Sequence, residues 1–360
     1  MGLKMNDGKP FGFLDALCSA RTPSGRETAG QRIVADYVRP YADSIRLDRL
    51  GNLHAVKNPA AKTRVMVDAH CDENGLLVQY VDKNGFLYFS LVGGVNKQLL
   101  PGERVVLDGP EGPVNGVIGR KAIHLMSQKE REAGVGELTD LWIDIGAADK
   151  AEAEKAAPAG TFGTVDSGLR RLLGTRASAR AFDDRCGIVA VMDVLRLLDG
   201  KDIAVAAHFV SATQEELGLL GSKVAAYGID PALGISVDVT FASDDPKSDP
   251  KTVGEIRLGG GPVLGVGPNY DPAFCDFVRK TARDCGIPLQ IQPRSRGNGT
   301  DGFAMRHVRS GVPVVQVSIP LRYMHSAVET IDLQDVEATS RLLAAVLSAL
   351  PEEPAFGFRL

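Results

Sequence analysis

Residues 64–75 read RVMVDAHCDENG, and this stretch indicates the fold of the whole chain. Its first part, Arg64–Ala69, is a nearly continuous apolar run, as expected for a strand buried on both faces of a parallel sheet. The run ends at His70, and Asp72 and Glu73 follow directly. Ligand sites in open α/β sheets collect beyond the carboxyl ends of the strands. We therefore expect an α/β fold with a site that begins at His70.

Outward from this stretch, the chain has two kinds of pattern. Residues 1–74 and 167–360 combine helical patterns, such as Gly187–Leu198, with short apolar runs, such as Leu233–Val239. Residues 75–166 instead contain short β-like runs broken by turn signals such as Asn-Gly and Pro-Gly. This organisation predicts an α/β domain made of the two outer segments, with a small β-rich domain inserted at 75–166.

The bulk properties exclude several classes of protein. The 360 residues are 44% hydrophobic and 24% charged, the balance of a soluble protein with two domains. The net charge is −4 with no basic cluster, which argues against nucleic-acid binding. No apolar run approaches the roughly 20 residues that span a bilayer, and Met1–Pro10 is too polar for a signal peptide. We expect a cytoplasmic protein that binds neither nucleic acid nor membranes.

The cysteines are scattered and form no Cys-x-x-Cys pair, so no disulfide framework is indicated. We expect each to be a small buried side chain. Cys71 and Cys186 differ only in their neighbours, and a thiol beside His70 could make the site sensitive to oxidation.

Acidic residues and histidines gather at the ends of five predicted elements: His70, Asp183-Asp184, Glu215-Glu216, Asp238 and His325. So many carboxylates in one cleft would repel one another and resist ionisation. A pair of divalent cations removes this difficulty, because bound cations become the largest local charges. Imidazole and carboxylate without a thiolate cluster suit Zn²⁺, Co²⁺ or Mn²⁺. A single Asp-Asp or Glu-Glu pair is usually a solvated turn, but the full order is hard to obtain by chance.

These residues resemble those of the di-metal glutamyl or tetrahedral (TET) aminopeptidase family, some members of which are labelled endoglucanases. The matching segments run in order along the chain: LGNLHAVK (50–57), VDAHCDENG (67–75), GVIGRKAIH (116–124), LWIDIGA (141–147), AFDDRCG (181–187), TQEELGLLG (213–221), VDVT (237–240), GTDG (299–302) and IPLRYMHS (319–326). The resemblance implies a three-layer α/β/α catalytic domain of the aminopeptidase type. It makes 75–166 a dimerisation domain whose dimers build a dodecamer. Cys71 and Asn74 depart from the pattern, because relatives usually have apolar residues there.

The resemblance also implies the role of each site residue. The implied ligands are His70 and Asp238 for one ion, Glu216 and His325 for the other, and Asp183 as a bridge between both. Asp72 would fix the His70 imidazole from behind. The Asp183–Asp184 peptide would be cis, a geometry that aims the bridging carboxylate.

The implied reaction is removal of N-terminal residues from peptides. Two divalent ions per subunit, Zn²⁺ in the first instance and otherwise Co²⁺ or Mn²⁺, would generate a bridging hydroxide that attacks the scissile carbonyl. Glu215 would act as the general base and pass the proton to the leaving amine.

Two alternatives stay open. A related di-metal amide hydrolase, either a carboxypeptidase or a deacylase, would need an arginine placed for a carboxylate, and Arg322 is the candidate. An inactive shell-forming homologue is disfavoured, because every implied ligand and Glu215 are present. Glycoside hydrolysis is also disfavoured, since no pair of carboxylates is left free of metal binding.

Overall fold

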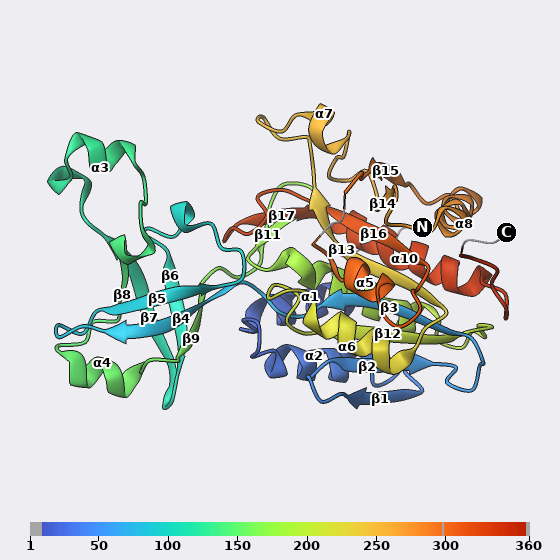
Figure 1. The fold of residues 1–360 in the computed structure, drawn as a ribbon, viewed down its shortest axis with the longest axis horizontal. Coiled ribbons are helices and arrows are strands. Elements are labelled where there is room, and N and C mark those ends of the chain that lie inside the picture. The colour runs from blue at the N-terminus through green and yellow to red at the C-terminus, as the bar shows by residue number, and fades with distance from the viewer. Residues whose placement is uncertain (1–8, 297–298, 358–360) are drawn as a thin grey trace.

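A mixed sheet forms the centre of the larger part of the molecule (Figure 1). The computed structural model describes residues 9–296 and 299–357. The strand order is β1-β2-β12-β3-β13-β16-β14-β15. The bounds are β1 (Ser44–Leu47), β2 (Leu53–Lys57), β3 (Arg64–His70), β12 (Ala206–Ala212), β13 (Leu233–Phe241), β14 (Val263–Val266), β15 (Gln290–Pro293) and β16 (Val314–Leu321). The four central strands β12, β3, β13 and β16 are parallel, so their carboxyl ends point the same way.

Helices cover both faces of this sheet, and the three-layer α/β/α prediction is confirmed. One face carries α1 (Lys9–Ser19), α2 (Thr28–Val38), α5 (Phe182–Leu197), α8 (Pro272–Asp284) and α10 (Leu333–Ala349); the other carries α6 (Leu220–Ile229) and α9 (Asp301–Arg306). Strand β3 packs against both layers, because Val65 and Val67 face the first and Met66 faces the second. This explains why its sequence is apolar at successive positions, Val65 to Val67, rather than at alternate ones.

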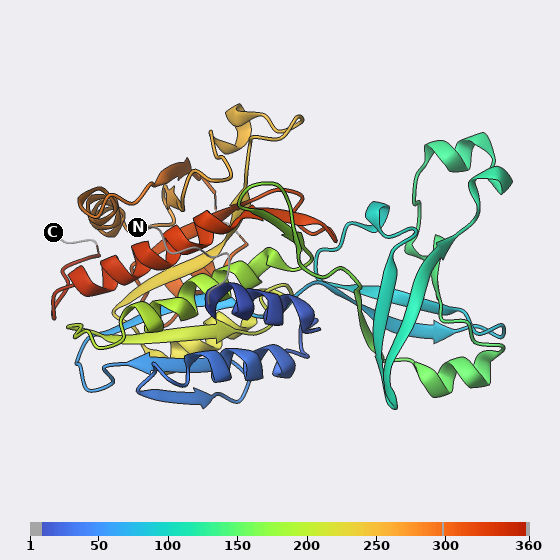
Figure 2. The ribbon, with the colours of Figure 1, turned by 180° about the vertical axis from the view of Figure 1, so that it is seen from behind.

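A closed barrel projects from the sheet region at one end of the molecule (Figure 2). Its strands follow the order β4-β5-β8-β7-β6-β9: β4 (Gly75–Val81), β5 (Leu87–Val92), β8 (Leu141–Asp144), β7 (Gly112–Arg120), β6 (Arg104–Gly109) and β9 (Phe162–Val165). The barrel has its own apolar core, which includes Leu76, Leu107 and Ile143. The short helices α3 (Gln128–Glu132) and α4 (Lys150–Ala156) lie in its connections. The turn-rich pattern of this region therefore belongs to a β-rich structure, as predicted.

The remaining elements complete the sheet region. Strands β10 (Arg170–Arg171), β11 (Arg176–Ala179) and β17 (Glu329–Asp332) form a small antiparallel sheet, and α7 (Pro250–Val253) lies in a loop. The helix predicted to begin at Gly187 begins earlier, at Phe182, with two non-helical residues, Asp183 and Asp184, near its start. Within the described residues, none of the helices is long and apolar enough to cross a membrane.

Candidate active site

The parallel strands bring the predicted site residues to one end of the sheet. His70 is the last residue of β3, and Ala212 of β12 lies opposite it, so that Glu215 and Glu216 follow close by. Asp238 of β13 lies level with His70, because Ser236 pairs with Asp68 two residues earlier on each strand. The remaining predicted residues come from the start of α5 and the connection between β16 and β17.

Two histidines share one aspartate at the centre of this group. The Nε2 atom of His70 lies 3.1 Å from Oδ1 of Asp183, and Nε2 of His325 lies 3.3 Å from Oδ2 of the same side chain. His325 Nε2 is also 3.5 Å from Glu216 Oε1. Ligand atoms of His70, Glu215 and Asp238 lie within 4.8 Å of one another, as do those of His70, Asp183 and Glu216. The site thus offers two overlapping sets of imidazole and carboxylate atoms.

Burial makes these carboxyl groups hold protons that they would otherwise lose. It raises the pKa of Glu215 to about 11, of Glu216 to about 8 and of Asp238 to about 7. Burial also acts to raise the pKa of Asp183, but hydrogen bonds with His325 and His70 outweigh it and hold the pKa of this carboxyl group below its ordinary value. Buried carboxyl groups that cannot all ionise, beside two imidazoles, are a donor set that a divalent cation fits.

Asp72 orients the turn that carries the two glutamates. Its Oδ1 accepts a hydrogen bond from the Glu215 backbone N–H (3.0 Å), and Oδ2 accepts from Glu216 N–H (3.1 Å) and from Ser24 Oγ (2.6 Å). His70 Nδ1 lies 3.2 Å from the backbone carbonyl of Asp72 and 3.4 Å from its carboxylate. Asp72 therefore contacts both the imidazole and the glutamate turn, whereas the sequence indicated only the first contact.

The Asp183–Asp184 peptide is cis, as the resemblance predicted. Asp184 is fully buried and accepts hydrogen bonds from the backbone N–H groups of His70 (3.4 Å) and Gly187 (3.1 Å). A Cβ atom at Gly187 would lie 2.1 Å from Asp184 Oδ1, so only glycine fits. This contact explains the spacing of Asp184 and Gly187 in the AFDDRCG segment.

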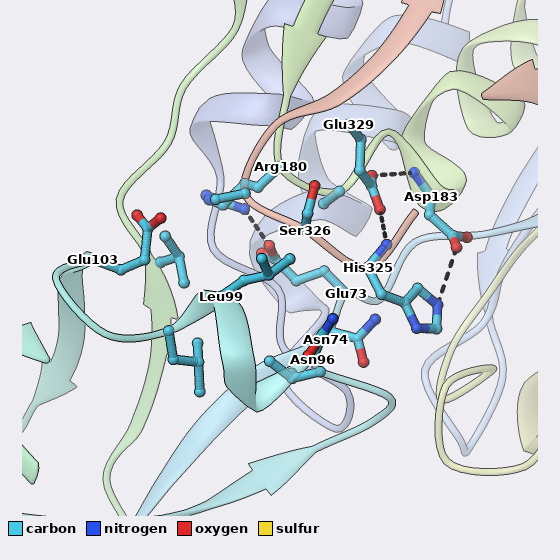
Figure 3. A pocket seen from close by; sticks show the side chains of 15 residues that line it. Glu73, Asn74, Asn96, Leu99, Glu103, Arg180, Asp183, His325, Ser326 and Glu329 are labelled. Atoms are coloured by element: carbon cyan, nitrogen blue, oxygen red, sulfur yellow. Dashed lines mark hydrogen bonds and ion pairs between the residues drawn. The ribbon is translucent and has the colours of Figure 1, made fainter. Parts of the chain in front are cut away.

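Sequence reasoning missed Glu329, which links two of the predicted ligands. Its Oε2 accepts a hydrogen bond from the backbone N–H of Asp183 (3.0 Å), and Oε1 accepts from that of His325 (2.7 Å) (Figure 3). The side chain is 2% exposed. A single glutamate with no acidic neighbour in the sequence gave no signal that could have identified it.

Two other predicted features take no part in the cluster. Arg322 donates from Nε to Asp244 Oδ1 (2.8 Å), so its guanidinium is already engaged. Cys71 packs toward α2: a Cβ atom at Gly30 would lie 2.5 Å from its Sγ. Burial raises the pKa of the Cys71 thiol to about 12 and that of Cys186 well above its ordinary value, so both are neutral core thiols.

A cavity opens beside the cluster, between the sheet region and the barrel. Asp183, His325 and Asn74 line one side, and Asn96 and Leu99 from the barrel line the other (Figure 3). Imidazole and carboxylate atoms gathered beside such a cavity, at the end of an α/β sheet, are an arrangement that suits a metal-dependent hydrolase.

Comparison with known proteins identifies the family. The model of the M42 glutamyl aminopeptidase family matches residues 51–342. A lysyl aminopeptidase of Pyrococcus furiosus is 38% identical over 330 residues, which cover 91% of this chain and 93% of that protein. The solved structure of a TET aminopeptidase from a marine sediment archaeon of the Thaumarchaeota is similar with a TM-score of 0.90 at 32% identity, covering 95% of this chain and 97% of that one. The TET1 peptidase of Pyrococcus horikoshii has a TM-score of 0.85 at 29% identity, covering 95% and 100%.

The chain belongs to the M42 glutamyl aminopeptidase family, and the predicted resemblance to TET aminopeptidases is confirmed. It is an aminopeptidase, and therefore a hydrolase.

Proposed function

We propose that the protein removes N-terminal residues from peptides by a two-ion mechanism in which Glu215 is the general base. The observation that most supports two ions is the position of Asp183, which presents one oxygen to His70 at 3.1 Å and the other to His325 at 3.3 Å. A carboxylate between two imidazoles in this way suits a bridge between two cations.

The proposed ligands are His70 and Asp238 for the first ion, Glu216 and His325 for the second, and Asp183 for both. When bound, the ions supply positive charge that polarises a carbonyl group and lowers the pKa of water. The donor set of imidazole and carboxylate favours Zn²⁺, with Co²⁺ and Mn²⁺ as alternatives.

Glu215 is the clustered carboxyl group that this assignment does not use as a metal ligand. It is 7% exposed, and its backbone is fixed by the hydrogen bond to Asp72. Burial alone keeps Glu215 protonated, but the positive charge of bound cations would favour its ionised form. In that form, a carboxylate at this position takes a proton from the attacking water and returns it to the leaving amine. Because Glu215 also lies within ligand distance of His70 and Asp238, its role as a base has to be separated from a role as a ligand.

The arginine that could receive the carboxyl end of a peptide is already engaged. Arg322, the candidate receptor for a C-terminal carboxylate, is paired with Asp244 at 2.8 Å. This pairing favours an aminopeptidase over a carboxypeptidase.

The experiment compares wild type with Glu215→Ala on a short peptide, on its N-acetylated form and on its C-terminal amide. We expect cleavage of the free and amidated peptides and none of the acetylated one. Glu215→Ala should lower the rate by about 10²–10⁴-fold, with metal content by elemental analysis near that of wild type. Glu137→Ala on the barrel surface is the matched control. Full activity of Glu215→Ala would refute the role of Glu215 as the general base. Loss of an ion from this variant would show that Glu215 is a metal ligand.

We also propose that residues 75–166 form a dimerisation domain and that dimers build a dodecamer. The TET1 peptidase of Pyrococcus horikoshii can assemble into a tetrahedron or a large octahedral shell. Ile123 and Leu125 support a contact through this region, because 60% and 72% of these apolar residues are exposed on it. Native mass spectrometry of the 38.3 kDa chain tests the assembly, and a monomer would contradict it.

A further inference from the structure

Among the described residues, the partners that hold the ligands proposed for the first ion come from the sheet region. His70 Nδ1 contacts the Asp72 backbone carbonyl at 3.2 Å, and its backbone N–H donates to Asp184. Asp238 Oδ1 accepts from the backbone N–H of Val239 (2.6 Å). Asp72 lies in the loop directly after β3, Asp184 is in α5 and Val239 is in β13, so these partners all belong to the sheet region.

The side chains proposed as ligands of the second ion have contacts on the barrel side, in addition to the backbone bonds of Glu216 to Asp72 and of His325 to Glu329. Asn74 Nδ2 donates a hydrogen bond to Glu216 Oε1 (2.6 Å), and His325 Nδ1 donates to the backbone carbonyl of Gly94 (2.9 Å). Asn74 directly precedes β4, and Gly94 follows β5. Since Gly75 pairs with Val92, both contacts come from the open end of the first barrel hairpin.

This hairpin end is packed tightly against the two ligands. A Cβ atom at Gly94 would lie 2.8 Å from Nδ1 of His325. At Gly93, where φ is +80°, a Cβ atom would lie 2.1 Å from Asn74 Oδ1 and 3.2 Å from the Cβ of Glu216. Any side chain larger than hydrogen at these positions must therefore displace Asn74, Glu216 or His325.

Asn74 contributes one donor that an apolar residue lacks. Its Oδ1 is buried and has no hydrogen-bond partner among the described residues, so the Nδ2–Glu216 contact is the one that the amide makes. The bond fixes which way the Glu216 carboxylate points and favours its ionised form. His325, with Nδ1 committed to Gly94, presents Nε2 to Asp183 and Glu216.

We propose that Asn74, at the junction with the barrel, and Gly94, in the barrel, are positioning residues that set the metal affinity of the Glu216–His325 half of the site, and of that half alone. The inference rests on the proposed two-ion function. It goes further, because it assigns different supports to the two halves and gives a role to the asparagine that distinguishes this chain from the family pattern.

The test uses the variants Asn74→Leu and Gly94→Ala of the full chain, loaded with Co²⁺ alone. Anomalous diffraction from crystals equilibrated at graded Co²⁺ concentrations reports the occupancy of each half separately. We expect the half-saturating Co²⁺ concentration at Glu216–His325 to rise roughly 10–100-fold, while that at His70–Asp238 changes less than about twofold. Asn74→Ala is the second variant, because it removes the amide without adding bulk.

Two controls match these changes. Asn115→Leu replaces an exposed asparagine of the barrel, and Gly168→Ala places a Cβ where no atom lies within 4 Å. Both should bind Co²⁺ like wild type. Equal weakening at both halves, or no weakening in either test variant, would overturn the inference. Wild-type crystals that took up no Co²⁺ at all would instead overturn the proposed two-ion function.

Discussion

The sheet region buries many charged side chains, whereas the barrel buries none. Between residues 75 and 166, all of which the structure describes, Thr161 and Thr164 are the buried polar residues, and no charged side chain is buried. The carboxyl end of the sheet buries Asp183, Asp238, Glu215 and several more acids. Burying a charge is costly unless it is paired. The difference indicates that the sheet region gives up stability for chemistry, whereas the barrel is an ordinary apolar core.

The largest effect on stability is expected where a buried charge is already paired. Glu73 Oε1 accepts a hydrogen bond from Arg185 (2.6 Å), and Oε2 pairs with Arg180. Glu73→Ala would leave two buried guanidinium groups without this partner and should cost about 3–5 kcal/mol, measured by urea unfolding. On the barrel side, Asp108→Ala breaks a half-exposed pair with Arg21 and should cost less than about 1 kcal/mol. Equal losses of unfolding free energy in the two variants would contradict the contrast between the two regions.

An intermediate effect of the opposite sign is expected for Asp238→Asn in chelator-treated protein. Burial and the neighbouring Asp183 raise the pKa of Asp238 from 3.8 to about 7 in the folded state. Ionisation therefore costs stability as the pH rises from about 4 toward 7, and this loss is complete above the folded value. At pH 8 the free energy of unfolding of the asparagine variant should exceed that of wild type by at least about 1.4 kcal/mol, the value of a tenfold change in an acid constant.

The pH series supplies the control for this prediction. The stabilisation by Asp238→Asn should disappear at pH 4, where the wild-type carboxyl group is largely protonated. Asp144→Asn on the barrel should leave unfolding unchanged at both pH values within about 0.5 kcal/mol. A stabilisation independent of pH would show that charge is not the cause.

The smallest effect is the proton release that accompanies ion binding. A hydrogen bond with Asp183 raises the pKa of His325 to about 9, and burial raises that of Glu216 to about 8. Both groups hold protons at pH 7 and must lose them to bind a cation, so affinity should rise with pH up to about 9. Calorimetry of Zn²⁺ binding in two buffers of different ionisation enthalpy should show release of about one proton or more. Binding without proton release would contradict these pKa directions.

The sequence predicted the fold and the members of the cluster for a physical reason. Parallel strands such as β3 and β13 end on the same side, so His70 and Asp238 could be placed together from the strand pattern alone. The closing of the barrel could not be predicted, because it requires β4 to pair with β9, about 85 residues away along the chain. Glu329 and Asn74 act through contacts across the fold, and a lone polar residue carries no periodic signal.

The closure of the β4–β9 ring has a consequence for how the barrel region meets other molecules. An open sheet would offer a row of unpaired N–H and C=O groups to which strands of other molecules could add. A ring in which each strand has two neighbours has no edge strand. The barrel region can therefore expose apolar side chains such as Leu125 without also presenting a strand edge that favours fibril growth.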